Sequence, residues 1–548
     1  MDYTRHFATR LMRLFTPQHE PIPNTSQVPN SAGGYAFPVD RWSRLDRFLV
    51  LGSEGGTYYI GERTLTQENA KAVVECLAED GLRTVERILE VSVAGRAPKN
   101  DPALFALAIA AGVGDAPTQA KAWEVLPSVA RTGTHLLHFL QYLKAFRGWG
   151  RSVRRAVAAW YTAKPAEELL YQVLKYPSRD GWAQRDALRL AHPKAPTVAH
   201  DLVFRYATKG WEGVVTLAGV GDMAVVQTME AVESLQFQAP GLAAQTIARH
   251  GLTREMVPTP LLQHAVVWEA LLERMPLTAL VRNLGTMTKV GLLAPYSRAA
   301  KRVVERLGDT AAIRKARVHP VAILAALKTY AQGHGMKGKN SWQPVAQVVD
   351  ALDRAFYLAF RNAPSTGRRV MLALDVSGSM TSRVLGMEYL SCREASAAMA
   401  LVTAATEPHH RFTAFTAGNH PSRWGPQLGA GLSTLAISPR QRLDDVVRRI
   451  TGLTFGGTDC ALPMLEALKH RWAIDLFVIY TDNETWAGAV HPAQALRLYR
   501  ERMGIPAKLV VVGMASNGFS IADPADAGML DVVGFDSAVP ELLAEFGR

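Results

Sequence analysis

Over the first two-thirds of the chain, apolar residues recur at the three- and four-residue spacing of amphipathic helices. In "TLTQENAKAVVECLAED", for example, Ala70, Val73, Val74 and Leu77 fall on one helix face. Similar segments of three or four turns follow up to about residue 365, each ending near glycine or proline. Strand-like alternation is nearly absent there. The pattern predicts an α-solenoid of irregular helical pairs.

The last third of the chain has a different pattern. Short apolar runs typical of buried strands alternate with helical segments; the runs are "RRVMLAL", "RFTAF", "AIDLFVIY", "PAKLVVVG" and "DVVGF". Alternating strands and helices predict a doubly wound, mainly parallel α/β sheet. The helical segments between these strands are predicted at Val384–Thr406, Pro439–Ile450, Cys460–Trp472 and His491–Met503.

Two segments rich in turn-forming residues divide the chain. Residues 17–38 contain many Pro, Ser, Asn and Gly residues and predict a loop or an extended arm. "RNAPSTG" predicts a linker near residues 362–368. We therefore expect an N-terminal arm at 1–40, a helical domain at 41–365 and an α/β domain at 366–548.

The composition of the 548-residue chain is that of an ordinary globular protein, with 48% hydrophobic and 20% charged residues. No apolar run approaches the roughly 20 residues of a membrane span, and the N-terminus lacks the apolar core of a secretory signal. The three cysteines form no C-x-x-C pair, which argues against a disulfide framework or a structural zinc site. We expect a cytoplasmic protein that does not engage a membrane.

The net charge of +12 is unevenly distributed. Residues 1–365 hold 44 Lys and Arg against 31 Asp and Glu, whereas residues 366–548 hold 17 against 18. The basic excess of the helical part favours a polyanionic partner. A merely solvated basic surface would have the same composition.

Three loops of the α/β domain carry oxygen ligands. "LDVSGSM" places Asp375, Ser377 and Ser379 after the first predicted strand, "FGGTDCALP" places Thr458 before a helix, and "FVIYTDNET" places Asp482 after another strand. The carboxyl ends of parallel strands meet at one sheet edge. Oxygen ligands without imidazole or thiolate suit Mg²⁺, Mn²⁺ or Ca²⁺ rather than zinc. For D-x-S-x-S alone, a helix N-cap is the structural alternative.

Catalysis is disfavoured by the same residues. "VSGSM" is not the G-x-S-x-G of a serine hydrolase, and no histidine follows a strand end as a base for Ser377 would. Phosphodiester hydrolysis usually requires clustered carboxylates, and only Asp375 and Asp482 are available. We expect a protein that is not an enzyme. A metal-dependent adhesion or scaffold module is the alternative, although it does not explain the basic helical part.

The helical part contains three stretches in which basic residues are dense. "KAFRGWGRSVRRAVAAWY" and "LKYPSRDGWAQRDALRLAHPK" interleave cations with aromatic residues, as single-stranded RNA readers do. "TYAQGHGMKGKNSWQP" adds glycines that permit close backbone approach, but its G-K is not followed by the Ser or Thr of a phosphate-binding loop. In the first stretch, Arg151, Arg154 and Arg155 share a helix face. These arginines could contact phosphates, or they could simply form a solvated helix face.

The three loops of the α/β domain resemble the metal-ion-dependent adhesion site of von Willebrand factor A domains. This resemblance implies direct ligation of the cation by Ser377, Ser379 and Thr458. It implies that Asp375 and Asp482 act largely through coordinated waters.

Nearly the whole chain resembles the Ro autoantigen family of TROVE-domain RNA-binding proteins. The resemblance is carried by "RFLVLGSEGGTYYI", "WGRSVRRAVAAWY", "MPLTALVRNLGTMT", "ARVHPVAILAALKTYAQGHGMKGK", "LDVSGSM", "GGTDCALPM", "YTDNETWAGAV" and "IPAKLVVVGMASNGFSIADP". It implies a ring of HEAT-like helices closed by the von Willebrand factor A domain. It also implies a central basic hole for single-stranded ends of misfolded or immature structured RNA, and an outer surface for small noncoding Y RNAs.

In bacterial members of that family, the bound Y RNA can tether an exoribonuclease. The resemblance implies a protein that supports RNA quality control, rRNA maturation or decay, and we expect it to be monomeric when free. The composition, without a secretion or nuclear signal, favours a bacterial or phage-borne orthologue. By motif, the Y RNA contacts carry over to Lys175, Arg179 and His192. Pro177 and Ser178 stand where animal members tend to be more basic, a departure that leaves the affinity for Y RNA open.

The hole lining is inferred from the remaining basic motifs. Arg282, in "LTALVRNLG", could equally cap a helix C-terminus. The predicted lining residues are His138, Lys144, Arg147, Arg151, Arg282, Lys337 and Lys339.

Overall fold

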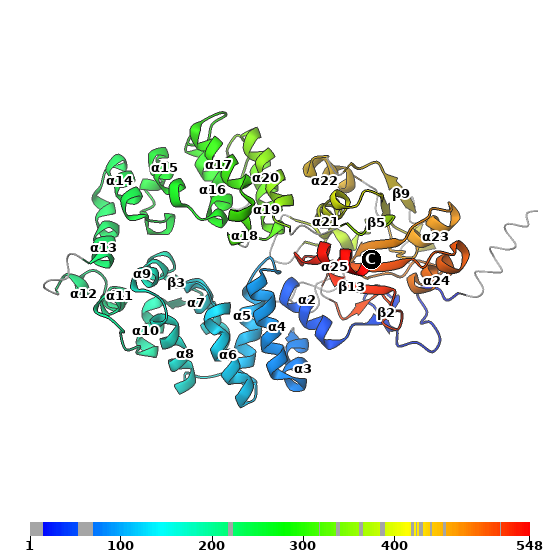
Figure 1. Ribbon diagram of the computed structural model, residues 1–548, viewed down its shortest axis with the longest axis horizontal. Coiled ribbons are helices and arrows are strands. Elements are labelled where there is room, and N and C mark those ends of the chain that lie inside the picture. Colours follow the sequence, from blue (N-terminus) through cyan, green and yellow to red (C-terminus); the bar gives the residue numbers. More distant parts are fainter. Residues whose placement is uncertain are drawn as a thin grey trace, which may run out of the picture.

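The computed structural model describes most of the chain as a helical arc with an α/β domain at its open side (Figure 1). The described residues are 15–52, 70–216, 223–316, 318–335, 340–360, 365–383, 390–417, 421–422, 425–426, 431–438, 441–452, 456–515 and 517–548. Within these ranges no helix is long and apolar enough to cross a membrane.

The helical arc confirms the predicted mainly helical N-terminal part. In its described residues, strands are limited to a short hairpin, β3 (Ser178–Arg179) with β4 (Trp182–Ala183), and one isolated bridge. The helices are α2 (Arg41–Leu51), α3 (Lys71–Glu79), α4 (Gly81–Ala94), α5 (Asp101–Val113), α6 (Ala116–Val129), α7 (Gly133–Leu143), α8 (Arg151–Thr162), α9 (Ala166–Lys175), α10 (Gln184–Ala191), α11 (Val198–Lys209), α12 (Glu212–Val215), α13 (Ala224–Ser234), α14 (Pro240–His250), α15 (Ala265–Arg274), α16 (Leu277–Lys289), α17 (Arg298–Gly308), α18 (Thr310–Ala316), α19 (Pro320–Ala331) and α20 (Ala346–Leu358).

Local sequence signals define the helix ends. Asp80 begins α4 by accepting a hydrogen bond from the Arg83 amide, and Gly95 ends it in the left-handed conformation at φ 66°. Between such caps the apolar stripe packs inward, as Val85, Ile88 and Val91 do in α4. Because α5 is apolar on all sides, it is the buried helix between its neighbours α4, α6 and α7.

The α/β domain is a six-stranded sheet in the order β13-β11-β10-β5-β6-β9, which confirms the predicted doubly wound class. Only the β6–β9 pair is antiparallel among these strands. The strands are β5 (Val370–Asp375), β6 (His410–Phe415), β9 (Leu432–Leu435), β10 (Leu476–Thr481), β11 (Lys508–Gly513) and β13 (Met529–Val533). The helices are α21 (Cys392–Thr406), α22 (Leu443–Thr451), α23 (Leu462–Lys469), α24 (Pro492–Met503) and α25 (Val539–Gly547).

Alternate residues of the central strands pack into two separate cores. Leu372 and Tyr480 face the layer of α21, α22 and α25, which is continuous with the core of the helical arc. Met371 and Phe477 face the opposite layer of α23 and α24. Strands covered on both faces explain the continuous apolar runs in the sequence.

The described part of the N-terminal segment lies along the α/β domain, although it is far away in the sequence. β1 (Val28–Pro29) pairs with β2 (Tyr35–Pro38), which pairs with β12 (Phe519–Ser520). Gln18 is fully buried, and its Nε2 donates to Asp459 Oδ1 at 2.7 Å and to the Val490 carbonyl at 2.8 Å. The segment is extended, as predicted, and it is tied to the third of the chain farthest from it.

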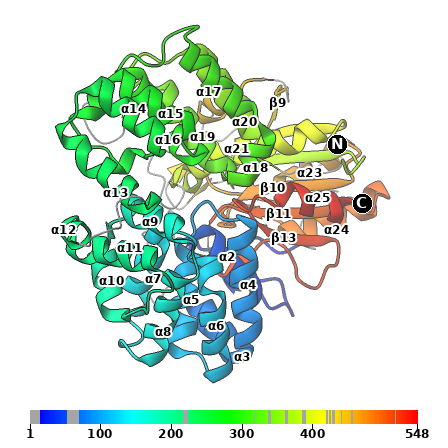
Figure 2. The ribbon, with the colours of Figure 1, turned by 60° about the vertical axis from the view of Figure 1, so that its left-hand side comes forward.

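Both ends of the helical arc join the α/β domain, which closes a ring (Figures 1 and 2). At the first end, Arg47 of α2 forms an ion pair with Asp531 of β13 at 2.6 Å. At the other end, Lys328 of α19 forms one with Glu394 of α21 at 2.5 Å. The two ends also meet, since His319 Nε2 lies 3.0 Å from the carbonyl oxygen of Arg96.

Candidate metal site and RNA-binding surface

The strand ends bring the two predicted carboxylates together. β5 and β10 are parallel neighbours in which Leu374 pairs with Tyr480, so Asp375, at the end of β5, and Asp482, directly after β10, lie at the same sheet edge. Thr481 donates to Asp375 Oδ2 at 2.6 Å and links the strand ends directly. The carboxylates are therefore placed by sheet register rather than by a flexible loop.

The three hydroxyl residues come to the same edge. The Ser377 amide donates to Asp375 Oδ1 at 2.8 Å, and the Ser377 and Ser379 hydroxyl oxygens are 3.0 Å apart. The carbonyl of Thr458 accepts from the amides of Trp486 and Ala487, which fastens the Thr458 loop to the loop after β10. All five predicted residues belong to one buried cluster.

The electrostatics of this cluster favour a cation. Burial raises the pKa of Asp375, and burial followed by the charge of Asp375 raises the pKa of Asp482. Both carboxyls are almost completely buried, as is Thr458. Thr458 Oγ1 and Asp482 Oδ2 have no hydrogen-bond partner in the described structure. Two buried carboxylates with unpartnered oxygens beside them fit a hard divalent cation.

The cluster differs from the common carboxylate- or histidine-rich metal sites. Within the described residues, no group of three or more His, Cys, Asp or Glu side chains is placed to hold a metal ion. Here two carboxylates are complemented by three hydroxyls, a donor set that still consists of hard oxygens.

Two residues that sequence reasoning missed support these loops. Gln18 bridges them, because it bonds Asp459 beside Thr458 and accepts a hydrogen bond from Thr485 beyond Asp482. Arg393 of α21 donates to the carbonyls of Val376 and Ser377. No local pattern singles out either residue, because each acts through a contact distant in sequence.

The predicted Y RNA residues lie on consecutive elements that pack around α7. Lys175 ends α9, Arg179 lies in β3, and His192 follows α10 in the left-handed conformation at φ 49°. Arg179 and His192 are exposed. Lys175 is half-buried and donates to the Tyr171 hydroxyl at 2.7 Å, so its ammonium has a fixed position.

His138 does not offer its ring to a ligand, contrary to the prediction that it lines the hole. It is only 7% exposed. Its Nδ1 bonds Asp180 of the β3–β4 turn, and its Nε2 lies 3.7 Å from Asp101 Oδ1. The ring thus anchors the hairpin that carries Arg179. The sequence motifs suggested the residue but could not show that carboxylates from two other segments lie beside both ring nitrogens.

The other predicted basic residues have different environments. Lys144 is exposed, whereas Arg147 donates to the Ala111 carbonyl and to Gln119. Arg282 is exposed in the middle of α16, so it does not cap that helix. Lys337 and Lys339 lie outside the described residues.

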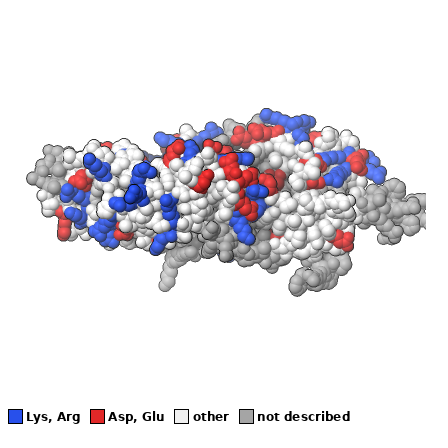
Figure 3. Space-filling view, turned by 90° about the horizontal axis from the view of Figure 1, so that it is seen from below, with Lys and Arg blue, Asp and Glu red and all other residues white. Residues whose placement is uncertain are grey.

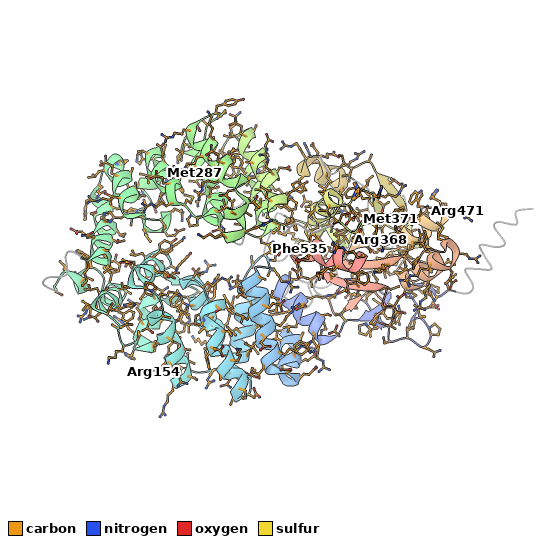
Figure 4. All side chains as sticks on the ribbon, viewed as in Figure 1. Arg154, Met287, Arg368, Met371, Arg471 and Phe535 are labelled. Carbon is orange, nitrogen blue, oxygen red and sulfur yellow. The ribbon has the colours of Figure 1, made fainter. Side chains whose placement is uncertain are left out.

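The arginines of α8 are exposed together. Arg151, Arg154 and Arg155 make no ion pair with any described residue. Arg154 points outward from the rim of the arc (Figure 4). Figure 3 shows basic side chains gathered over the helical half of the face in view. Cations at the N-terminal end of a helix are repelled by its dipole, which makes an anionic ligand favourable there.

The aromatic residues interleaved with these cations have structural roles. Trp160 is fully buried and donates to the Ala130 carbonyl at 2.6 Å. Trp149 stacks on Trp182 with ring centroids 5.8 Å apart and donates to the Leu190 carbonyl. The expected mixture of cations and aromatics is present, but these rings connect α8, the hairpin and α10 to one another.

Comparison with known proteins matches both halves of this architecture. A family model described as the TROVE domain matches residues 28–216 and 247–329, and one described as the Ro60 vWA domain matches residues 369–547. The chain belongs to the Ro60 family. It is 42% identical to the RNA-binding protein RO60 of Deinococcus radiodurans over 98% of this chain and 99% of that one.

Further relatives agree. The RNA-binding protein RO60 of Caenorhabditis elegans is 37% identical over 95% of this chain and 90% of its own. The crystal structure of the Deinococcus radiodurans RO (RSR) protein aligns with a TM-score of 0.69, at 42% identity, over 93% of this chain and 99% of that chain. Membership of this family supports RNA binding and is consistent with a noncatalytic role.

Proposed function

We propose that this Ro60-family protein is the noncatalytic core of a Y RNA ribonucleoprotein. Y RNA binds the outer surface at Lys175, Arg179 and His192. Single-stranded ends of misfolded or immature structured RNA enter a basic hole inside the helical ring. The protein is cytoplasmic and monomeric when free, and it supports RNA quality control, rRNA maturation or decay together with a partner exoribonuclease.

The observation that carries this proposal is the exposed arginine group of α8 in a helical domain of the RNA-binding family. Arg151, Arg154 and Arg155 have no carboxylate partner in the described structure, and they stand at the positive end of their helix. Pairing such charges with carboxylates would offset their mutual repulsion. Retaining them exposed favours phosphate as their ligand, because guanidinium groups bind phosphate through paired hydrogen bonds.

The buried cluster of two carboxylates and three hydroxyls has a separate role in this proposal. Ser377, Ser379 and Thr458 hold Mg²⁺, Mn²⁺ or Ca²⁺ directly, and Asp375 and Asp482 hold it largely through waters. The unpartnered Thr458 and Asp482 oxygens support this arrangement. In the adhesion or scaffold alternative for this domain, the cation would bind a carboxylate of a protein partner.

Binding of structured RNA with a single-stranded 3′ tail, compared with the blunt form, tests the hole. We expect the tailed RNA to bind more tightly, and equal affinities would refute a binding site for RNA ends. Arg179→Ala should weaken Y RNA more than tailed RNA, because Arg179 lies on the hairpin surface. Lys301→Ala, an exposed cation of α17, is the matched control. Equal losses for both RNAs would refute two separate surfaces.

A further inference from the structure

A cavity of about 190 Å³ opens beside Lys175, where α9 meets the segment after α14 and the α15–α16 junction. Its wall includes Tyr171 and Lys175 from α9, Arg254 and Glu255 from the short turn after α14, and Arg274 from the end of α15. Drug-sized ligands usually occupy larger pockets, of roughly 300 Å³ and more. The space therefore fits a single small ring or group.

The charges around the cavity are not neutralised by one another. Arg254 and Arg274 are exposed and make no ion pair within the described part of the chain. Lys175 is held by the Tyr171 hydroxyl and lies over the Tyr171 ring, 5.0 Å from its centroid. Among the described residues of the wall, Glu255 is the one acid, so three cations stand against one carboxylate. The cavity attracts an anion.

The uncharged part of the wall suits a flat ring. Leu271 and Met275 supply buried apolar surface, and Tyr171 contributes an aromatic ring. The backbone approaches closely at Gly251, where φ is 63° and an added Cβ would lie 2.8 Å from Arg274 Nη1. A side chain at Gly251 would displace Arg274, so the glycine keeps the guanidinium at the cavity.

We propose that this cavity binds one unpaired nucleotide of the RNA. The base lies against Tyr171, Leu271 and Met275, and the phosphate contacts Arg254 and Arg274. Glu255 accepts a hydrogen bond from an exocyclic amino group, which selects bases that carry such a group, adenine and cytosine among them, over uracil. This inference rests on the proposed RNA-binding function and extends it, since Lys175 belongs to both the predicted Y RNA surface and the cavity wall.

Mononucleotides test the cavity without the rest of the RNA. Titration calorimetry with the full-length protein should show that AMP and CMP bind roughly tenfold more tightly than UMP. Arg254→Ala and Arg274→Ala should each weaken AMP binding roughly tenfold, because each removes a charge-assisted contact to phosphate. Glu255→Gln should reduce the difference in binding affinity between AMP and UMP. Lys301→Ala should leave all three affinities unchanged.

The same preparations should be titrated with tailed structured RNA, with circular dichroism as the check on folding. Absence of mononucleotide binding, equal affinities for AMP and UMP, or identical affinities for Arg254→Ala and Lys301→Ala would overturn the nucleotide cavity while leaving RNA binding intact. If the folded wild-type protein does not bind tailed RNA, the proposed function is overturned instead. Arg254 is exposed on a short turn, so its alanine variant tests the cavity without removing core packing.

Discussion

Replacing Arg47 with methionine should weaken the junction between the helical ring and the α/β domain. Arg47 is 1% exposed, and its guanidinium donates to Asp531 at 2.6 Å, to the Asn517 side chain at 2.9 Å and to the Phe519 carbonyl at 3.0 Å. Methionine fills part of the space but leaves the Asp531 carboxylate and buried carbonyls without this donor. Breaking a buried ion pair in this way costs about 3–5 kcal/mol.

Arg41 provides a control on the same helix. It forms an ion pair with Glu79 at 2.7 Å, but both side chains are about half exposed. Exposed pairs contribute about 0–1 kcal/mol, so Arg41→Met should cost at most that amount. The double variant Arg47→Met/Asp531→Leu should recover part of the loss, because it removes the unpaired charge together with its former partner.

Urea unfolding and native-state hydrogen exchange measure this effect. The chain has two domains that need not unfold together, so exchange of amides in α2 and β13 should be followed alongside the global transition. Arg47→Met should increase exchange at both elements. If Arg47→Met lowers the free energy of unfolding by less than about 1 kcal/mol, no more than Arg41→Met does, the conclusion that this buried pair stabilises the junction is refuted.

Three further predictions concern the cation, pH and phosphate contacts. Mg²⁺ or Mn²⁺ at 100 times Kd should stabilise the wild type by about 2.7 kcal/mol in thermal unfolding, and Thr458→Ala should abolish the stabilisation. Burial lowers the pKa of His319 to about 4, below its unfolded value of about 6.5. The unfolded state therefore binds the extra proton, and the free energy of unfolding should fall by up to about 3 kcal/mol as pH drops from 6.5 to 4. For the His319→Asn variant, denaturation at several pH values should show a free energy of unfolding that depends less on pH. Replacing Arg151, Arg154 and Arg155 with alanine should reduce the slope of log affinity against log salt by about 0.7 per lost single-strand phosphate contact, and an unchanged slope would show that α8 does not touch RNA.

The sequence predicted the parts of the site that depend on strand order. A carboxylate directly after a buried parallel strand must appear at the carboxyl edge of the sheet, so strand order alone places Asp375 and Asp482 together. It could not predict the support from Gln18, because that contact joins positions 441 residues apart. It also could not show that Thr458 Oγ1 and Asp482 Oδ2 lack hydrogen-bond partners among the described residues.

The sequence identified the basic residues but did not show which of them are exposed and which are bound to other side chains. Charge density and helical spacing selected Arg151, Arg154 and Arg155, and the structure leaves all three exposed. His138 and Arg147 were predicted to line the hole, and the structure engages them with Asp180 and Gln119. The cavity residues Arg254 and Arg274 escaped attention because neither lies in a dense basic stretch.

By itself the sequence determined the division into a helical part and an α/β part, the oxygen chemistry of the metal loops and the location of the basic excess. These properties follow from periodicity and residue type, which act over a few positions along the chain. Only the tertiary structure decided which described cations have no ion-pair partner and that a cavity lies beside Lys175. It also decided that Arg47 joins the helical arc to the α/β domain and that His319 joins the two ends of the arc. The physical reason is that pairing, burial and ring closure depend on contacts between segments distant in sequence, and no local pattern encodes those contacts.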